Sequence, residues 1–90
     1  MLKIKYRKSF EKDVKRAGKR GLDLGKLKEI MLFLAEEKTL ADKHRDHSLS
    51  GNYSGHRECH IQPDWLLIYK KEPGLIVFER TGTHSDLFKT

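Results

Sequence analysis

Residues 56–78 read HRECHIQPDWLLIYKKEPGLIVF, and this stretch decides the fold. A strand is predicted near residues 56–61, and the unbroken apolar run Trp65–Tyr69 predicts a central strand covered on both faces. The sequence Lys71-Glu72-Pro73-Gly74 puts proline and glycine at the central positions of a type II turn. Residues 75–78 then form the return strand of a hairpin. These segments predict the centre of a mainly antiparallel sheet.

Helical spacing dominates the chain before this sheet. Residues 2–6 alternate apolar side chains with lysines, as in a short edge strand. Apolar residues recur at helical spacing over residues 7–17 and, more strongly, over residues 24–37. Residues 38–55 are expected to be irregular, and residues 83–88 to form one helical turn. The predicted fold class is α+β, with two N-terminal antiparallel helices packed on a small twisted sheet and a short C-terminal helical turn.

The charge of the chain is concentrated at its N-terminus. Ninety residues form one domain, residues 1–90, with a net charge of +6. Nine of the 19 lysines and arginines lie in residues 1–20, against two acidic residues. A basic helix favours a polyanion, either nucleic acid or an acidic protein, although a solvated helix face explains the same pattern. The residues expected to contact such a polyanion are Arg7, Lys8, Lys12, Lys15, Arg16, Lys19 and Arg20.

Composition also limits the cellular setting. Cys59 is the one cysteine, which excludes an internal disulfide and a CxxC pair and suits a reducing cytoplasm. The first twenty residues are too charged for a signal peptide, and the longest apolar run, Ile30–Ala35, cannot span a bilayer. We therefore expect a cytoplasmic protein with no membrane partner.

All five histidines lie between positions 44 and 84. On a strand near residues 56–61, His56, Glu58 and His60 point to one face, whereas Cys59 and Ile61 point to the other. If the helices cover the second face, His60 lies on the open face, where a substrate can bind. Histidine both takes and gives protons near neutral pH, so convergence of the histidine-bearing segments predicts an acid–base site.

Other interpretations of the same residues are less demanding. His44 and His56 are expected to be exposed residues without a catalytic role, and Trp65 and Phe88 fit a hydrophobic core as well as a binding site. A metal site at His56 and His60 is not expected, because four residues of strand separate them by roughly 13 Å. The prediction is therefore that the site holds no metal and the protein uses no cofactor.

The histidine-bearing segments resemble a known family. Residues 57–69 (RECHIQPDWLLIY) and 80–88 (RTGTHSDLF) look like the YafQ branch of the RelE/ParE toxin superfamily, and residues 46–51 (DHSLSG) are similar to its His-x-Leu-x-Gly element. The resemblance covers nearly the whole chain. It implies ribosome-dependent cleavage of mRNA by a toxin that a cognate antitoxin holds inactive. The family's functional positions correspond to His47, His60, Asp64, Trp65, His84 and Phe88.

Metal-free RNA cleavage requires a base for the 2′-hydroxyl, an acid for the departing 5′-oxygen and positive charge near the phosphate. We predict that His47, with or without Asp64, is the base, that His84 is the acid, and that His60 stabilises the transition-state charge or orients the nucleotide. The sequence also allows the base and the acid to be exchanged. Substrate contacts are expected from Trp65, Arg80 and Phe88.

The partners predicted for such a toxin are a cognate acidic antitoxin, ribosomal RNA and mRNA. The alternative is a non-catalytic interaction protein on the same fold, either a gyrase-inhibitor-like toxin or an RNA-binding module. A pure binding protein has no need of histidines in three separate segments. This feature favours the endoribonuclease interpretation.

Overall fold

The computed structural model describes residues 1–88. Its strands form one sheet in the order β1-β5-β4-β3-β2, in which β1 pairs in parallel with β5 and the other neighbours are antiparallel. This arrangement confirms the predicted α+β fold class. The elements are β1 (Lys3–Tyr6), α1 (Lys8–Lys19), α2 (Leu24–Ala35), β2 (His47–Ser48), β3 (Arg57–Gln62), β4 (Trp65–Glu72), β5 (Leu75–Gly82) and α3 (His84–Phe88), with two 3-10 turns, η1 (Asp42–His44) and η2 (Gly51–Tyr53).

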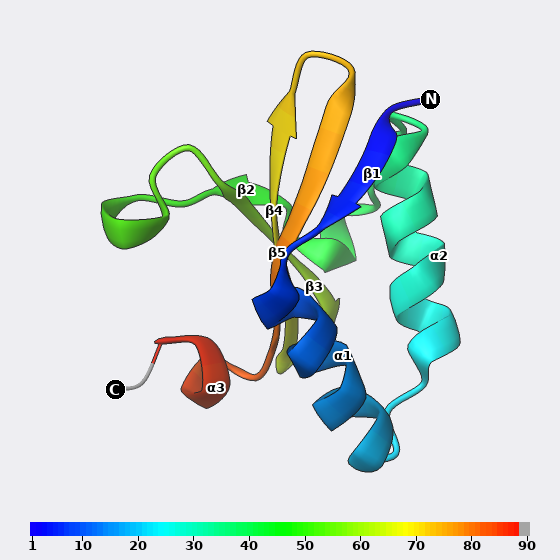
Figure 1. The fold of residues 1–90 in the computed structure, drawn as a ribbon, viewed down its shortest axis with the longest axis vertical. Helices are drawn as coiled ribbons and strands as arrows, with labels where there is room; N and C mark the ends of the chain where they lie inside the picture. Colours follow the sequence, from blue (N-terminus) through cyan, green and yellow to red (C-terminus); the bar gives the residue numbers. More distant parts are fainter. Residues whose placement is uncertain (89–90) are drawn as a thin grey trace.

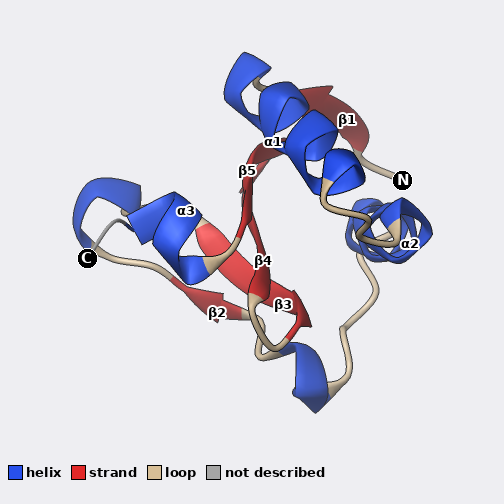
Figure 2. Cartoon of the chain, turned by 90° about the horizontal axis from the view of Figure 1, so that it is seen from below, coloured by secondary structure: helices blue, strands red, loops and turns tan. Residues whose placement is uncertain are grey.

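The sheet separates two hydrophobic cores of unequal size. Helices α1 and α2 lie side by side on one face, running in opposite directions (Figures 1 and 2). Their apolar side chains pack on Cys59, Leu67 and Phe78 in the larger core. On the other face, Leu87 of α3 packs on Leu66 and Ile68 of β4. The apolar run of β4 is covered on both faces, as its sequence predicts.

Local sequence accounts for the hairpins. The β4–β5 turn contains Gly74 at φ 71°, the left-handed conformation that the predicted type II turn requires. The region predicted to be irregular needs one correction, because residues 47–48 form strand β2 and pair with β3. A strand of two residues forms only where the edge of another strand is available to pair with it. No local sequence pattern therefore marks such a strand. Among residues 1–88, no helix has the length and apolarity needed to cross a bilayer.

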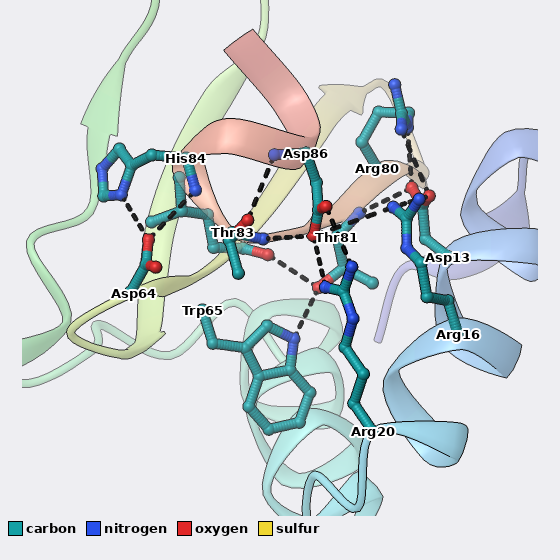
Figure 3. A network of polar contacts seen from close by, with 11 residues as sticks. Asp13, Arg16, Arg20, Asp64, Trp65, Arg80, Thr81, Thr83, His84 and Asp86 are labelled. Atoms are coloured by element: carbon teal, nitrogen blue, oxygen red, sulfur yellow. Dashed lines mark hydrogen bonds and ion pairs between the residues drawn. The ribbon is translucent and has the colours of Figure 1, made fainter. Parts of the chain in front are cut away.

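A buried carboxylate fastens α1 to β5. Asp13 is 5 % exposed and accepts hydrogen bonds from Arg80 Nε at 2.7 Å, Arg80 Nη2 at 3.2 Å and the backbone N–H of Thr81 at 3.1 Å. Arg16, one turn further along α1, donates to the same carboxylate at 2.9 Å. A buried carboxylate needs partners of this kind to remain charged. Asp13 thereby fixes the position of α1 on the sheet (Figure 3).

Candidate active site

Three of the predicted histidines come together on the open face of the sheet. His47 begins β2, His60 lies on β3, and His84 begins α3. The ring centroid of His60 lies 6.5 Å from that of His47 and 5.8 Å from that of His84. Cys59 and Ile61 point into the helix-side core, which leaves His60 on the opposite face, as the strand alternation predicts. His60 is therefore the central imidazole of the cluster.

Glu58, a carboxylate that no sequence motif marks as functional, joins two of the imidazoles. Glu58 is 4 % exposed, and its Oε1 lies 3.6 Å from His47 Nε2 and 3.5 Å from His60 Nε2. Its position on the same strand face as His60 was the available signal. Glu58, His47 and His60 therefore form one connected group on the open face of the sheet.

The backbone fixes the orientation of His47. Its Nδ1 lies 2.6 Å from the carbonyl oxygen of Arg45. A carbonyl oxygen can only accept, so Nδ1 carries the hydrogen and donates it. In the neutral imidazole, Nε2 then has a free lone pair that points toward Glu58. In this tautomer Nε2 can act as a general base, with the Glu58 carboxylate beside it.

Asp64 orients His84. Its Oδ1 accepts from both the backbone N–H of His84 at 3.0 Å and His84 Nδ1 at 2.7 Å. These two hydrogen bonds lower the pKa of the Asp64 carboxyl below its ordinary value. Of the two options for the base, the structure favours His47 without Asp64, because Asp64 lies at the β3–β4 turn and bonds to His84. Sequence spacing could not decide which histidine the turn would face.

A second set of hydrogen bonds holds α3 in place (Figure 3). The backbone N–H of Thr83 donates to Asp86 Oδ2 at 2.9 Å, and the backbone N–H of Asp86 donates to Thr83 Oγ1 at 3.1 Å, a reciprocal cap. Arg20 donates two hydrogen bonds to the same carboxylate, at 2.6 Å and 3.1 Å. The hydrogen bond from Arg20 is the main cause that lowers the pKa of Asp86. The end of α1 therefore helps to set the position of His84.

The two predicted aromatic contacts differ in outcome. Trp65 is 2 % exposed, and its Nε1 donates to Thr81 Oγ1 at 3.0 Å within the core. The helix-side core encloses the indole of Trp65, which fits the core interpretation of this residue and gives its expected substrate contact no support. Phe88 is 37 % exposed and lies 6.4 Å from the ring of His84 and 6.0 Å from that of Tyr53. Its place beside the cluster keeps it a substrate-binding candidate.

Two histidines predicted to be exposed are half-buried. His44 Nδ1 donates to the backbone carbonyl of His60 at 2.7 Å, and His56 Nε2 lies 3.3 Å from Glu79 Oε2. The prediction was wrong for both, because contacts with distant parts of the chain cover them. Arg80, predicted to contact phosphate, has its Nε and Nη2 committed to Asp13.

The basic residues of the first helix fall into two groups. The arginines have acidic partners: Arg7 pairs with Glu79, and both Arg16 and Arg20 pair with Asp86. These contacts place the three arginines in the structural framework, and their contact with RNA stays a prediction. Four lysines remain exposed, without an ion pair to any residue of 1–88. We call them the α1 lysines: Lys8, Lys12, Lys15 and Lys19.

A set of metal-ligand atoms coincides with the acid–base cluster. Glu58, His60 and His84 each offer one ligand atom, and these atoms lie within 4.8 Å of one another. One carboxylate and two imidazoles are donors that suit zinc or copper. This set differs from His56 and His60, the pair at which the strand spacing predicts no metal. The tertiary fold supplies the third donor.

A family model described as bacterial toxin of type II toxin-antitoxin system, YafQ, matches residues 2–89, which defines the class as a type II toxin. An mRNA interferase toxin YafQ from Escherichia coli strain K12 is 46 % identical over 86 residues, covering 94 % of each chain. The chain belongs to the YafQ family, and the resemblance seen in the sequence is confirmed.

Two solved structures extend this comparison. YafQ in the E. coli DinJ-YafQ toxin-antitoxin complex is 45 % identical, with a TM-score of 0.90 and 97 % of each chain covered. A metal-bound toxin from Helicobacter pylori is 42 % identical, with a TM-score of 0.92, and the match covers 98 % of this chain and 100 % of that one. The predicted fold is therefore that of solved members of the same class.

Proposed function

We propose that the chain is an mRNA interferase: an endoribonuclease toxin of a type II toxin–antitoxin system that cleaves mRNA on the ribosome by acid–base catalysis. The observation that carries the proposal is the convergence of His47, His60 and His84 around the buried carboxylate of Glu58. The E. coli relative is an mRNA interferase. A binding protein would not require this arrangement of imidazoles.

The base is His47, supported by Glu58. With Nδ1–H held by the carbonyl of Arg45, the free Nε2 takes the proton of the ribose 2′-hydroxyl. The Glu58 carboxylate, 3.6 Å from this nitrogen, stabilises the imidazolium that forms. Glu58 thus replaces Asp64 as the acidic partner of the base.

The acid is His84. Asp64 accepts the hydrogen of its Nδ1 and orients the ring, and Nε2 delivers a proton to the departing 5′-oxygen. His60 lies between base and acid, where its charge stabilises the pentavalent phosphate. Phe88 contacts the bound nucleotide. Arg80 mainly orders the framework through Asp13, and its remaining donors are available to a phosphate.

The basic surface of the protein indicates two kinds of partner, ribosomal RNA and an acidic antitoxin. The α1 lysines form a basic face remote from the histidines in sequence, suited to ribosomal RNA phosphates. An acidic antitoxin would neutralise the same basic protein, and the E. coli relative forms a complex with the antitoxin DinJ. Such a toxin acts in the cytoplasm, where ribosomes translate mRNA. Production without an antitoxin should therefore arrest translation.

The test is single-turnover cleavage of ribosome-bound mRNA, with identification of the product ends. The proposed chemistry leaves a 2′,3′-cyclic phosphate or its 3′-phosphate product, and His84→Gln should slow cleavage by roughly 10²- to 10⁴-fold at saturation. His56→Gln is the matched control, because His56 lies outside the cluster. A 3′-hydroxyl product, or parental rates for His84→Gln, would contradict the mechanism.

A metal ion would compete with this chemistry. Glu58, His60 and His84 would hold it, and a metal there would supply Lewis acidity in place of proton transfer. The nitrogen lone pairs that bind a metal are the ones that carry protons in our mechanism. We therefore expect added Zn²⁺ to inhibit cleavage and a chelator to restore it. Activation by Zn²⁺ would overturn this part of the proposal.

A further inference from the structure

A cavity of about 710 Å³ opens beside the histidine cluster. Its volume falls within the range of roughly 300–1,000 Å³ typical of small-molecule sites. Residues from α2, from the segment around η1 and from the β3–β4 turn line it, and His60 and His84 reach it from the cluster. The cavity therefore extends from α2 and Ile61, on the helix side of the sheet, to His60 and His84 of the cluster.

The lining combines positive charge with apolar surface. Lys26, Lys43 and Arg45 line the cavity, with Glu29 as the acidic counterpart. None of the three cations forms an ion pair with another residue of 1–88, unlike the arginines of α1. The apolar part includes Ile61, which is 8 % exposed. Uncommitted cations beside apolar surface suit a nucleotide, which has an anionic phosphate and an apolar base face.

Arg45, which follows η1 and lines this cavity, has an unusual backbone conformation. Arg45 has φ 45° and ψ 46°, a left-handed conformation that is costly for a residue other than glycine. The conformation is held from both sides: His44 donates to the carbonyl of His60, and the Arg45 carbonyl accepts from His47. Asp46, the next residue, is fixed by Arg57 and Tyr69. These contacts fix the backbone of Arg45 between the cavity and β3, the strand that carries His60.

We propose that this cavity binds the nucleotide on the 3′ side of the cut, with Arg45 as the main contact to its 3′ phosphate and Lys26 and Lys43 as supporting cations. The choice of side rests on the proposed function: His84, the acid for the 5′-oxygen of that nucleotide, lines the cavity, whereas His47, the base, is not among its lining residues. These three cations are additional substrate-binding residues that the sequence did not single out.

The test couples a protein change to an RNA change. One mRNA carries a single uncharged methylphosphonate linkage at the phosphate that follows the 3′ nucleotide, and single-turnover rates are measured on saturated ribosome complexes. For the parental protein, the neutral linkage should slow cleavage by roughly ten- to a hundred-fold, the usual effect of one charge-assisted hydrogen bond. Arg45→Gln should slow cleavage of the normal mRNA by a similar factor. The rate of this variant should not fall further when the linkage is neutral.

Two further variants separate side chain from backbone. Arg45→Gly relieves the left-handed strain, so it should melt at or above the parental temperature and yet show the same cleavage defect as Arg45→Gln. Lys71→Gln, a surface change on β4 outside the cavity, is the control and should keep parental rates and parental sensitivity.

Equal sensitivity to the neutral linkage in the parental protein and Arg45→Gln would overturn the cavity proposal. So would weaker ribosome affinity without any change in saturated rate, because it would assign Arg45 to ribosomal RNA. Failure of the parental protein to cleave normal mRNA would instead refute the proposed function. The two failures are therefore distinguishable.

Discussion

Asp13→Asn tests the buried contact that holds α1 on the sheet. The substitution keeps the shape and an acceptor for the Thr81 N–H but removes the charge that Arg80 and Arg16 bind. Removing one partner of a fully buried pair costs about 3–5 kcal/mol. Here the Arg80 and Arg16 side chains are 26 % and 41 % exposed, so water can solvate them in the variant. We therefore expect a loss of about 2–3 kcal/mol.

The assay is urea unfolding with both proteins analysed at a common m value. For a domain of this size the loss corresponds to a melting temperature lower by roughly 8–24 °C. Arg80→Gln provides the second arm of a double-mutant cycle: combined with Asp13→Asn, it should cost less than the sum of the single changes. A loss below about 1 kcal/mol for Asp13→Asn, or strict additivity of the two changes, would refute the structural role assigned to this carboxylate.

Three further expectations concern the core, the helix clamp and the basic face. Trp65→Phe should cost about 1–3 kcal/mol in urea unfolding, because Thr81 loses the indole donor; an unchanged midpoint would argue against this buried bond. The folded pKa of Asp86 lies below its ordinary value of 3.8, so its stabilisation is present above that pH and is lost as pH falls through the folded pKa. Asp86→Asn should therefore be less stable than the parental protein near neutral pH, with the difference shrinking in acid; a pH-independent difference would exclude an ionic origin. Replacing the α1 lysines with glutamine should weaken ribosome binding and flatten its dependence on salt, whereas an unchanged salt slope would place the ribosome contact elsewhere.

The sequence determined the fold class and the histidine-bearing segments. Apolar periodicity fixes which face of a helix or strand is buried, because burial of apolar surface dominates the folding free energy. The same rule placed His60 on the opposite side of β3 from Cys59, and therefore on the open face of the sheet. The family resemblance rested on short segments, and the match to the family model over residues 2–89 confirmed it.

Tertiary structure alone decided how the polar groups pair. Asp64 lies four residues from His60 in the chain but bonds to His84, twenty residues away, and Arg20 reaches Asp86 across sixty-six residues. Local patterns carry no information on such contacts, since a surface charge and a paired charge have the same sequence signature. Trp65 shows the same limit for an aromatic residue, whose ring fits a core or a binding face equally well until its neighbours are placed. The cavity beside Arg45 likewise exists only once α2, the η1 segment and the β3–β4 turn are packed together.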